Sequence, residues 1–205
     1  MYSERIHKAV MFATKAHVGQ TRKGNDIPYI YHPMEVLQIL TEMDCDEDVK
    51  IAGVLHDTVE DTDTTIEDIK SEFGDNVASL VGGHTEDKSK TWVERKSEDL
   101  NSLRKGSIGL KAIVFADKLS NILSLYDDYR VLGDKVYDKF NANKDMQAWY
   151  YGELLKVFVE YKEDLSVELV DKYTEIYTNL FGDNNEAYSK KINAAYELLS
   201  NTIKK

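Results

Sequence analysis

The sequence predicts an all-α fold. Only two prolines occur in 205 residues, Pro28 and Pro33, and both lie in one loop. The long proline-free stretches outside this loop are rich in leucine, alanine, glutamate and lysine, which favour helices. Apolar residues also recur three and four positions apart, as one buried face of a helix requires. We therefore expect a helical bundle with an additional helical extension at its C-terminal end.

Each expected helix has a local signal at one or both ends. Ser3 is a capping residue for the first helix and Gly19 ends it. Asp63 or Thr64 is expected to cap the fourth helix, which Gly74 closes. The expected helices cover residues 3–17, 33–43, 46–55, 65–73, 75–81, 91–104, 108–125, 135–140, 145–162, 167–181 and 184–203.

Composition excludes several classes of function. A formal charge of −11 and a pI near 4.9 argue against a protein that coats nucleic acid or an anionic membrane. A small anionic substrate is still compatible, because a metal ion and a few local cations can outweigh the overall field. The single cysteine, Cys45, rules out an intramolecular disulfide and a cysteine-based metal cage. With no apolar run of signal-peptide or membrane length, we expect a soluble cytoplasmic protein.

The stretch from Ala52 to Thr62 carries four ionisable residues behind an apolar run: His56, Asp57, Glu60 and Asp61. If this run is one helix, Glu60 lies one turn beyond His56 and Asp61 one turn beyond Asp57. Most charged clusters of this kind are solvated helix ends. The apolar lead-in, however, directs the His-Asp pair towards the interior, where such groups rarely lie without a partner. By itself the stretch fits a metal site and a solvated helix end equally well.

Two residues elsewhere can complete a metal site. His32 precedes Pro33, which favours the first turn of a helix, although a histidine bonded within the core fits this position equally well. Asp117 lies in the most apolar helix, where we favour a metal ion over a salt bridge as its partner. Together with His56 and Asp57, these ligands suit Mn²⁺, Fe²⁺ or Zn²⁺ better than Ca²⁺ or a thiolate site.

Such a site has the parts that metal-assisted hydrolysis needs. Four ligands leave two octahedral positions open for water or substrate oxygens. Glu60 and Asp61 are placed to orient or deprotonate that water. Arg22 and Lys23 can clamp a phosphate, although a solvated basic turn is the more common explanation of such a pair. Asn121 shares the helix face of Asp117.

The motifs around these residues resemble the hydrolase domain of the RelA/SpoT family, one of the HD-domain metal phosphohydrolases. The motifs are Ala16-His17-x-x-Gln20-x-Arg22-Lys23, Pro28-Tyr29-Ile30-x-His32-Pro33, Leu55-His56-Asp57-Thr58-Val59-Glu60-Asp61-Thr62 and Ala116-Asp117-Lys118-x-x-Asn121. Its small, single-domain bacterial branch is matched by Thr85-Glu86-Asp87-Lys88, Trp92-x-x-Arg95-Lys96 and Trp149-Tyr150-Tyr151. The resemblance implies an HD-type hydrolase domain over residues 1–160. We expect the C-terminal helices of residues 161–205 to pack on the same domain.

The resemblance also implies an activity: removal of the 3′-pyrophosphate from (p)ppGpp, giving GDP or GTP and pyrophosphate, with bound Mn²⁺. It implies metal ligands, a catalytic carboxylate pair and nucleotide contacts, which are respectively His32, His56, Asp57 and Asp117; Glu60 and Asp61; and Arg22, Lys23, Asn121 and Ser124.

Three departures from the family pattern bear on the nucleotide pocket. His84 stands at a usually apolar position, and Ser120 and Ile122-Leu123 replace bulkier or basic residues. Another phosphorylated nucleotide, such as an adenine alarmone or a dinucleotide cofactor phosphate, is therefore an alternative substrate. A catalytically silent nucleotide-binding module is a further alternative. The Glu60-Asp61 pair argues against it, because a pure binder needs no water-activating carboxylate.

Overall fold

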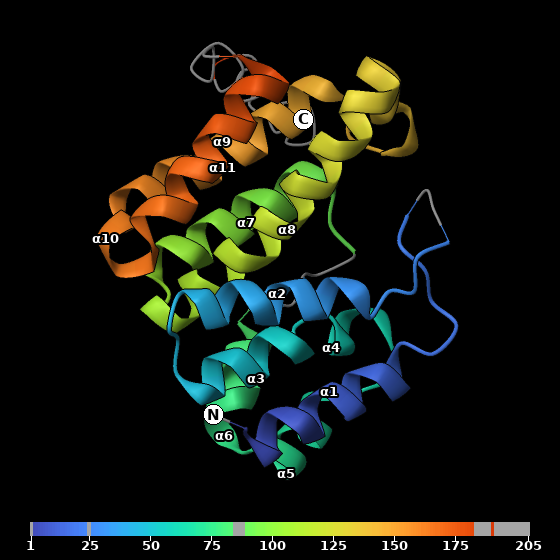
Figure 1. Ribbon diagram of the computed structural model, residues 1–205, viewed down its shortest axis with the longest axis vertical. Helices are drawn as coiled ribbons and strands as arrows, with labels where there is room; N and C mark the ends of the chain where they lie inside the picture. The colour runs from blue at the N-terminus through green and yellow to red at the C-terminus, as the bar shows by residue number, and fades with distance from the viewer. Residues whose placement is uncertain (1, 24–25, 84–88, 183–189, 191–205) are drawn as a thin grey trace, which may run out of the picture. The chain divides into compact units, whose positions relative to one another are not determined.

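The computed structural model describes residues 2–23, 26–83, 89–182 and 190 of the chain (Figure 1). Apart from one isolated bridge between Thr21 and Pro28, the regular elements of these residues are all helices. The predicted all-α fold is therefore confirmed. In chain order the elements are α1 (Glu4–Ala16), α2 (Tyr31–Glu42), α3 (Glu47–Leu55), α4 (Thr58–Asp61), α5 (Ile66–Phe73), α6 (Asp75–Gly82), α7 (Trp92–Lys105), α8 (Ile108–Leu132), the 3₁₀ helix η1 (Gly133–Lys139), α9 (Lys144–Glu160), α10 (Lys162–Leu165) and α11 (Val167–Phe181).

The chain divides into two compact units. We call Met1–Asp87 with Asn101–Ser120 the site unit, and Lys88–Leu100 with Asn121–Lys205 the tyrosine unit. Compact units of this kind are not the same as family domains, so the domain boundary predicted near residue 160 stays a prediction. Within the described residues, no helix is both long and apolar enough to cross a bilayer.

In the site unit, α3 is the central helix. It contacts α1, α2 and α6, and α5 packs on α6. Figure 1 shows α2 and α3 side by side. Gly53 permits this close approach, because a Cβ atom there would lie only 2.2 Å from Leu40 Cδ1 of α2. The absence of a side chain at Gly53 thus brings the beginning of α2, with His32, towards the end of α3, with His56.

Several helix ends agree with their sequence signals. The Ser3 hydroxyl accepts a hydrogen bond from the Ile6 amide at 3.1 Å and caps α1. Gly74 ends α5 with a φ of +96°, in the left-handed region that favours glycine. The predicted caps of α5, Asp63 or Thr64, were both wrong, because Thr65 caps the helix. Thr65 and Asp68 form a reciprocal capping box, which satisfies the amides of both residues.

Two helices extend further than the spacing predicted. α2 begins at Tyr31, two residues before Pro33, because proline is tolerated anywhere in a first turn that needs no amide donor. α8 continues seven residues beyond Leu125 to Leu132, until Gly133 ends it with a φ of +58°.

The tyrosine unit has an aromatic core built on α9, α10 and α11, which contact one another. Phe158 and Tyr173 are fully buried and meet edge to face, with ring centroids 5.3 Å apart. The Tyr173 and Tyr177 hydroxyls donate to the carbonyls of Tyr151 and Ala148, both at 3.2 Å. These aromatic residues therefore form the core of this unit. The helix expected over 184–203 lies outside the described residues, as do His84 and the motif of residues 85–88.

Candidate metal centre and active site

Four side chains from three segments converge inside the site unit. His32 comes from α2, His56 and Asp57 follow α3, and Asp117 lies in α8. His56 Nε2 lies 2.9 Å from Asp57 Oδ2, and His32 Nε2 lies 3.2 Å from Asp117 Oδ1. The two Nε2 atoms are themselves 3.3 Å apart. The structure therefore brings together all four residues that the sequence proposed as ligands.

A break between α3 and α4 presents His56 and Asp57 to this cluster. The run from Ala52 to Thr62 is not one continuous helix, because α3 ends at Leu55 and α4 begins at Thr58. Side chains take the carbonyls that a continuous helix would use: His56 Nδ1 lies 2.7 Å from Gly53 O, and the Thr58 hydroxyl donates to Leu55 O at 2.7 Å. The local turn thus fixes the imidazole of His56.

The cluster is buried and rich in opposing charge. Burial lowers the pKa of His32. Burial also lowers the pKa of His56, but Asp57 and Asp117 outweigh it and raise that pKa to about 9. Burial raises the pKa of Asp57, yet His56 and His32 outweigh this and hold it below its usual value. The two carboxylates therefore require positive charge beside them, which a proton on His56 or a divalent cation can supply.

The donor set fits a divalent transition-metal ion. The Gly53 carbonyl can only accept, so His56 Nδ1 carries its proton and Nε2 is available as a ligand atom. His32, His56 and Asp57 each offer one ligand atom, and these three atoms lie within 4.8 Å of one another. Asp117 Oδ1 is 3.8 Å from His56 Nε2. Imidazole nitrogens and carboxylate oxygens suit Mn²⁺, Fe²⁺ and Zn²⁺. The salt-bridge alternative for Asp117 is also present, since Lys118 Nζ lies 2.7 Å from its second oxygen, Oδ2.

Comparison with known proteins agrees with this geometry. Residues 9–146 match the sequence pattern of the HD domain. This chain belongs to the HD domain family. It is 36% identical over 163 residues to the Drosophila melanogaster protein named guanosine-3′,5′-bis(diphosphate) 3′-pyrophosphohydrolase MESH1, and the match covers 71% of this chain and 91% of the relative.

Two further relatives differ in how much of their own length matches this chain. A protein of the same enzyme name from Aquifex aeolicus is 38% identical over 131 residues, which are 61% of this chain but only 18% of the relative. The crystal structure of lmo0812 from Listeria monocytogenes superposes with a TM-score of 0.66 at 36% identity, covering 73% of this chain and 98% of that one. The HD domain therefore accounts for nearly all of some relatives and for a small part of others.

The proposed carboxylate pair of this HD domain lies in α4, directly after the cluster. Glu60 is half-buried and Asp61 is exposed. The amide of Asp61 donates to the carbonyl of Asp57 at 2.9 Å, so one turn of backbone joins the pair to a proposed ligand. Their role in catalysis stays a prediction.

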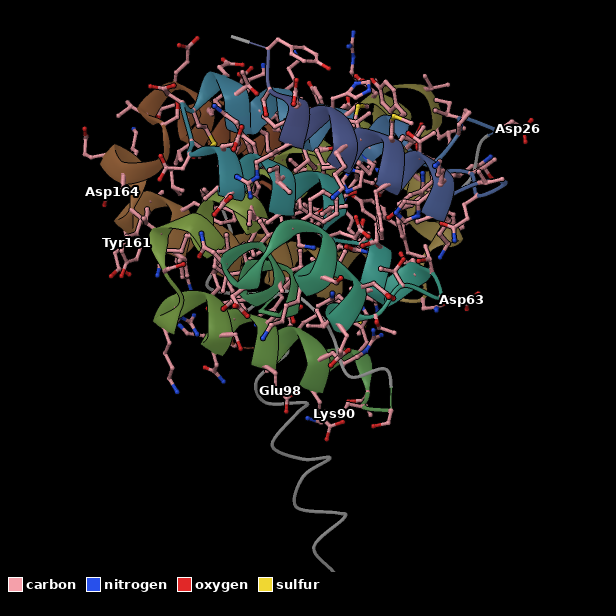
Figure 2. The ribbon with its side chains drawn as sticks, turned by 90° about the horizontal axis from the view of Figure 1, so that it is seen from below. Asp26, Asp63, Lys90, Glu98, Tyr161 and Asp164 are labelled. Carbon is pink, nitrogen blue, oxygen red and sulfur yellow. The ribbon has the colours of Figure 1, made fainter. Side chains whose placement is uncertain are left out.

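The residues proposed to contact substrate lie on two segments. Arg22 and Lys23 belong to the loop before α2, where the Arg22 guanidinium carbon is 5.9 Å from the centre of the Tyr29 ring. Asp26 marks the outer part of this loop in Figure 2. Asn121 and Ser124 follow Asp117 along α8, one turn and about two turns later. Their contacts with a nucleotide also stay predictions.

Sequence reasoning missed the residues that support the cluster from this loop. The Tyr29 hydroxyl donates to Asp57 Oδ2 at 2.6 Å, and its ring lies tilted against that of His17, with ring centroids 4.8 Å apart. The Gln20 side chain joins His17 Nδ1, at 2.8 Å, to the carbonyl of Asp61, at 2.7 Å. His17 is thus a packing histidine at the end of α1. The signal for the others was available, because Gln20 and Tyr29 lie inside the motifs that carry the resemblance.

Proposed function

We propose that this HD domain protein is a metal-dependent (p)ppGpp 3′-pyrophosphohydrolase, which releases GDP or GTP and pyrophosphate. The buried cluster of His32, His56, Asp57 and Asp117 carries the proposal, because it offers the ligands of a hydrolytic metal site. The substrate is proposed from the relatives, two of which bear the name of this enzyme. We propose Mn²⁺ as the metal, with Fe²⁺ or Zn²⁺ as alternatives for the same donors.

The proposed reaction divides its tasks among the residues of the site. The metal ion, when bound, acts as a Lewis acid that stabilises charge on the phosphate oxygens. Glu60 and Asp61 orient the attacking water and accept its proton. The water oxygen forms a bond to the phosphorus attached to the ribose 3′ oxygen, while the bond between that phosphorus and the 3′ oxygen breaks. A proton then completes the 3′ hydroxyl, and the former 3′ group leaves as pyrophosphate.

Cations and polar groups hold the substrate in this scheme. Arg22 offers a planar fork to phosphate oxygens, and Lys23 offers a point charge. Asn121 and Ser124 supply amide and hydroxyl groups for the nucleotide. Arg22 and Lys23 also provide local positive charge in a protein whose formal net charge is −11.

A hydrolysis panel tests the proposal. Purified protein is incubated with Mn²⁺, Fe²⁺ or Zn²⁺ and with ppGpp, pppGpp, their adenine counterparts or a dinucleotide carrying a phosphate on its ribose, and the products are separated by ion-exchange chromatography. We expect GDP or GTP and pyrophosphate from the guanine substrates, and no product after chelation. Turnover of the adenine or dinucleotide substrates alone would replace the proposed substrate. Bound metal without turnover of any of them would make the protein a binding module.

A further inference from the structure

His32 is supported from behind by two side chains that the proposed reaction does not use. Its Nδ1 lies 2.8 Å from the Ser120 hydroxyl of α8, and that hydroxyl lies 2.9 Å from Glu35 Oε2 of α2. His32 and Ser120 are both buried, with 1% and 0% of their surface exposed, and Glu35 is half-buried. All three belong to the site unit.

The chemistry of these groups fixes the direction of each hydrogen bond. A carboxylate only accepts, so the single hydroxyl proton of Ser120 is donated to Glu35. The Ser120 oxygen must then accept from His32, which places the imidazole proton on Nδ1. Nε2 is left with its lone pair directed at the cluster, as a metal ligand requires.

The Ser120 hydroxyl does not make the hydrogen bond within its own helix that such hydroxyls commonly make. A serine or threonine hydroxyl on a helix commonly donates to the carbonyl four residues earlier. Thr14, Thr41 and Thr174 do so in this protein, at 2.7, 2.7 and 2.8 Å. Ser120 instead joins His32 to Glu35, so its hydroxyl bonds across two helices rather than within its own.

We propose that Ser120 and Glu35 are positioning residues that hold His32 in its Nδ1-protonated tautomer and thereby set the metal affinity of the site. This inference rests on the proposed metal-dependent function. Without the Ser120 hydroxyl, Nδ1 loses its acceptor. The tautomer protonated on Nε2, in which Nε2 has no lone pair to offer the metal, then becomes accessible. Glu35 ends the series of hydrogen bonds that runs from His32 through Ser120. Its negative charge also makes the imidazole a stronger donor to the metal.

His56 provides an internal contrast. Its Nδ1 proton is held by the backbone carbonyl of Gly53, which no side-chain substitution removes. The tautomer of His32, by comparison, depends on two side chains, one of which is 88 positions away in the sequence. The inference therefore predicts an effect at one of the two histidines and none at the other.

Two measurements on the full chain test this inference. Mn²⁺ affinity is measured by titration calorimetry for the unmodified protein and for Ser120→Ala, Glu35→Gln and the control Thr41→Ala. We expect affinity to fall about 10- to 100-fold in Ser120→Ala, the usual range when a partner of a ligating histidine is lost. The fall should be smaller in Glu35→Gln, whose amide oxygen still accepts from Ser120, and absent in Thr41→Ala. At saturating Mn²⁺, kcat should return to near its original value.

The second measurement needs no metal and no activity. Nitrogen chemical shifts of the metal-free protein report the tautomer of each histidine. We expect His32 to be protonated on Nδ1 in the unmodified protein and to show a mixture of tautomers in Ser120→Ala. His56 should stay protonated on Nδ1 in both proteins. A His32 protonated on Nε2 in the unmodified protein overturns the inference, and so does unchanged Mn²⁺ affinity in a folded Ser120→Ala variant. Failure of the substrate panel alone would concern only the proposed function.

Discussion

The site unit and the tyrosine unit bury different kinds of side chain. The buried polar and charged residues of the site unit are His17, His32, His56, Thr58, Lys111, Asp117 and Ser120. Among the described residues of the tyrosine unit, Gln147 is the one buried residue of this kind. Its core consists instead of aromatic and aliphatic side chains whose tyrosine hydroxyls bond to backbone carbonyls.

This difference indicates which kinds of interaction stabilise each unit. Buried ionisable groups are expensive, so a unit that retains several of them gives up stability unless each finds a partner. The site unit satisfies several of them in pairs and chains, such as His32 with Ser120 and Lys111 with the carbonyls at the end of α7. Among the described residues, His17 Nε2 is buried without a hydrogen-bond partner. The tyrosine unit gains stability from apolar burial and ring contacts. Substitutions in the two units should therefore affect different properties.

The largest expected effect is at a proposed ligand. Asp57→Ala removes the carboxylate that lies 2.9 Å from His56 Nε2, so we expect loss of both metal and activity. The fall in kcat/KM should be about 10³-fold or more, the scale seen when an essential group is removed. Metal content by mass spectrometry and the nucleotide assay measure the two losses. Full metal content in this variant would contradict the assignment of Asp57.

Glu60→Ala should separate metal binding from catalysis in the same unit. We expect the metal to be retained and kcat to fall by about 10²- to 10⁴-fold, because only the proton acceptor is removed. The same two assays apply, with Asp57→Ala as the comparison. Equal metal loss in both variants would mean that Glu60 is a ligand and not a base.

Phe158→Ala tests the tyrosine unit. This side chain is fully buried against Tyr173, so truncation should lower the free energy of unfolding by about 3–5 kcal/mol. Metal stoichiometry at low temperature should not change, because no proposed ligand lies in this unit. Urea unfolding and metal analysis measure both quantities. Loss of metal from the folded variant would break the contrast between the units.

Tyr29→Phe makes a smaller change beside the cluster. It removes the hydroxyl that donates to Asp57 Oδ2 at 2.6 Å but keeps the ring on His17. We expect Mn²⁺ affinity to fall about tenfold, the lower end of the range for a lost outer partner of a ligand. Tyr2→Phe, at a tyrosine that is 75% exposed, is the matched control and should bind Mn²⁺ normally. Equal affinities in both variants would remove Tyr29 from the supporting set.

The smallest expected effect concerns the cap of α5 and depends on pH. Hydrogen bonds from the Thr65 amide and hydroxyl hold the pKa of Asp68 below its ordinary value of 3.8. The ionised carboxylate therefore stabilises the fold above that ordinary value, and the contribution disappears as pH falls through the lowered pKa. Asp68→Asn should lower Tm slightly at neutral pH, with a difference that shrinks below about pH 4. A Tm difference that grows in acid would contradict the assigned direction.

The sequence by itself determined the helices and the chemical types in the site. Proline placement, helical spacing and the signals at Ser3 and Gly74 act over a few residues, so they can be recognised without the fold. The same holds for His56 and Asp57, which are adjacent in the chain, and for the cost of burying Asp117 in an apolar helix. Helical spacing did not predict the break between α3 and α4, where the side chains of His56 and Thr58 form hydrogen bonds with backbone carbonyls.

The tertiary structure alone decided which atoms meet. The distance from His32 to Asp117 depends on the packing of α2 against α3, which Gly53 permits, and on the path of α8. The protonated nitrogen of His32 depends on Ser120, and the orientation of Asp57 depends on Tyr29, 28 positions away. Helical periodicity describes neighbours three and four residues apart. A hydrogen bond between distant segments has no such period, so only the folded chain shows that these supporting residues lie beside the site.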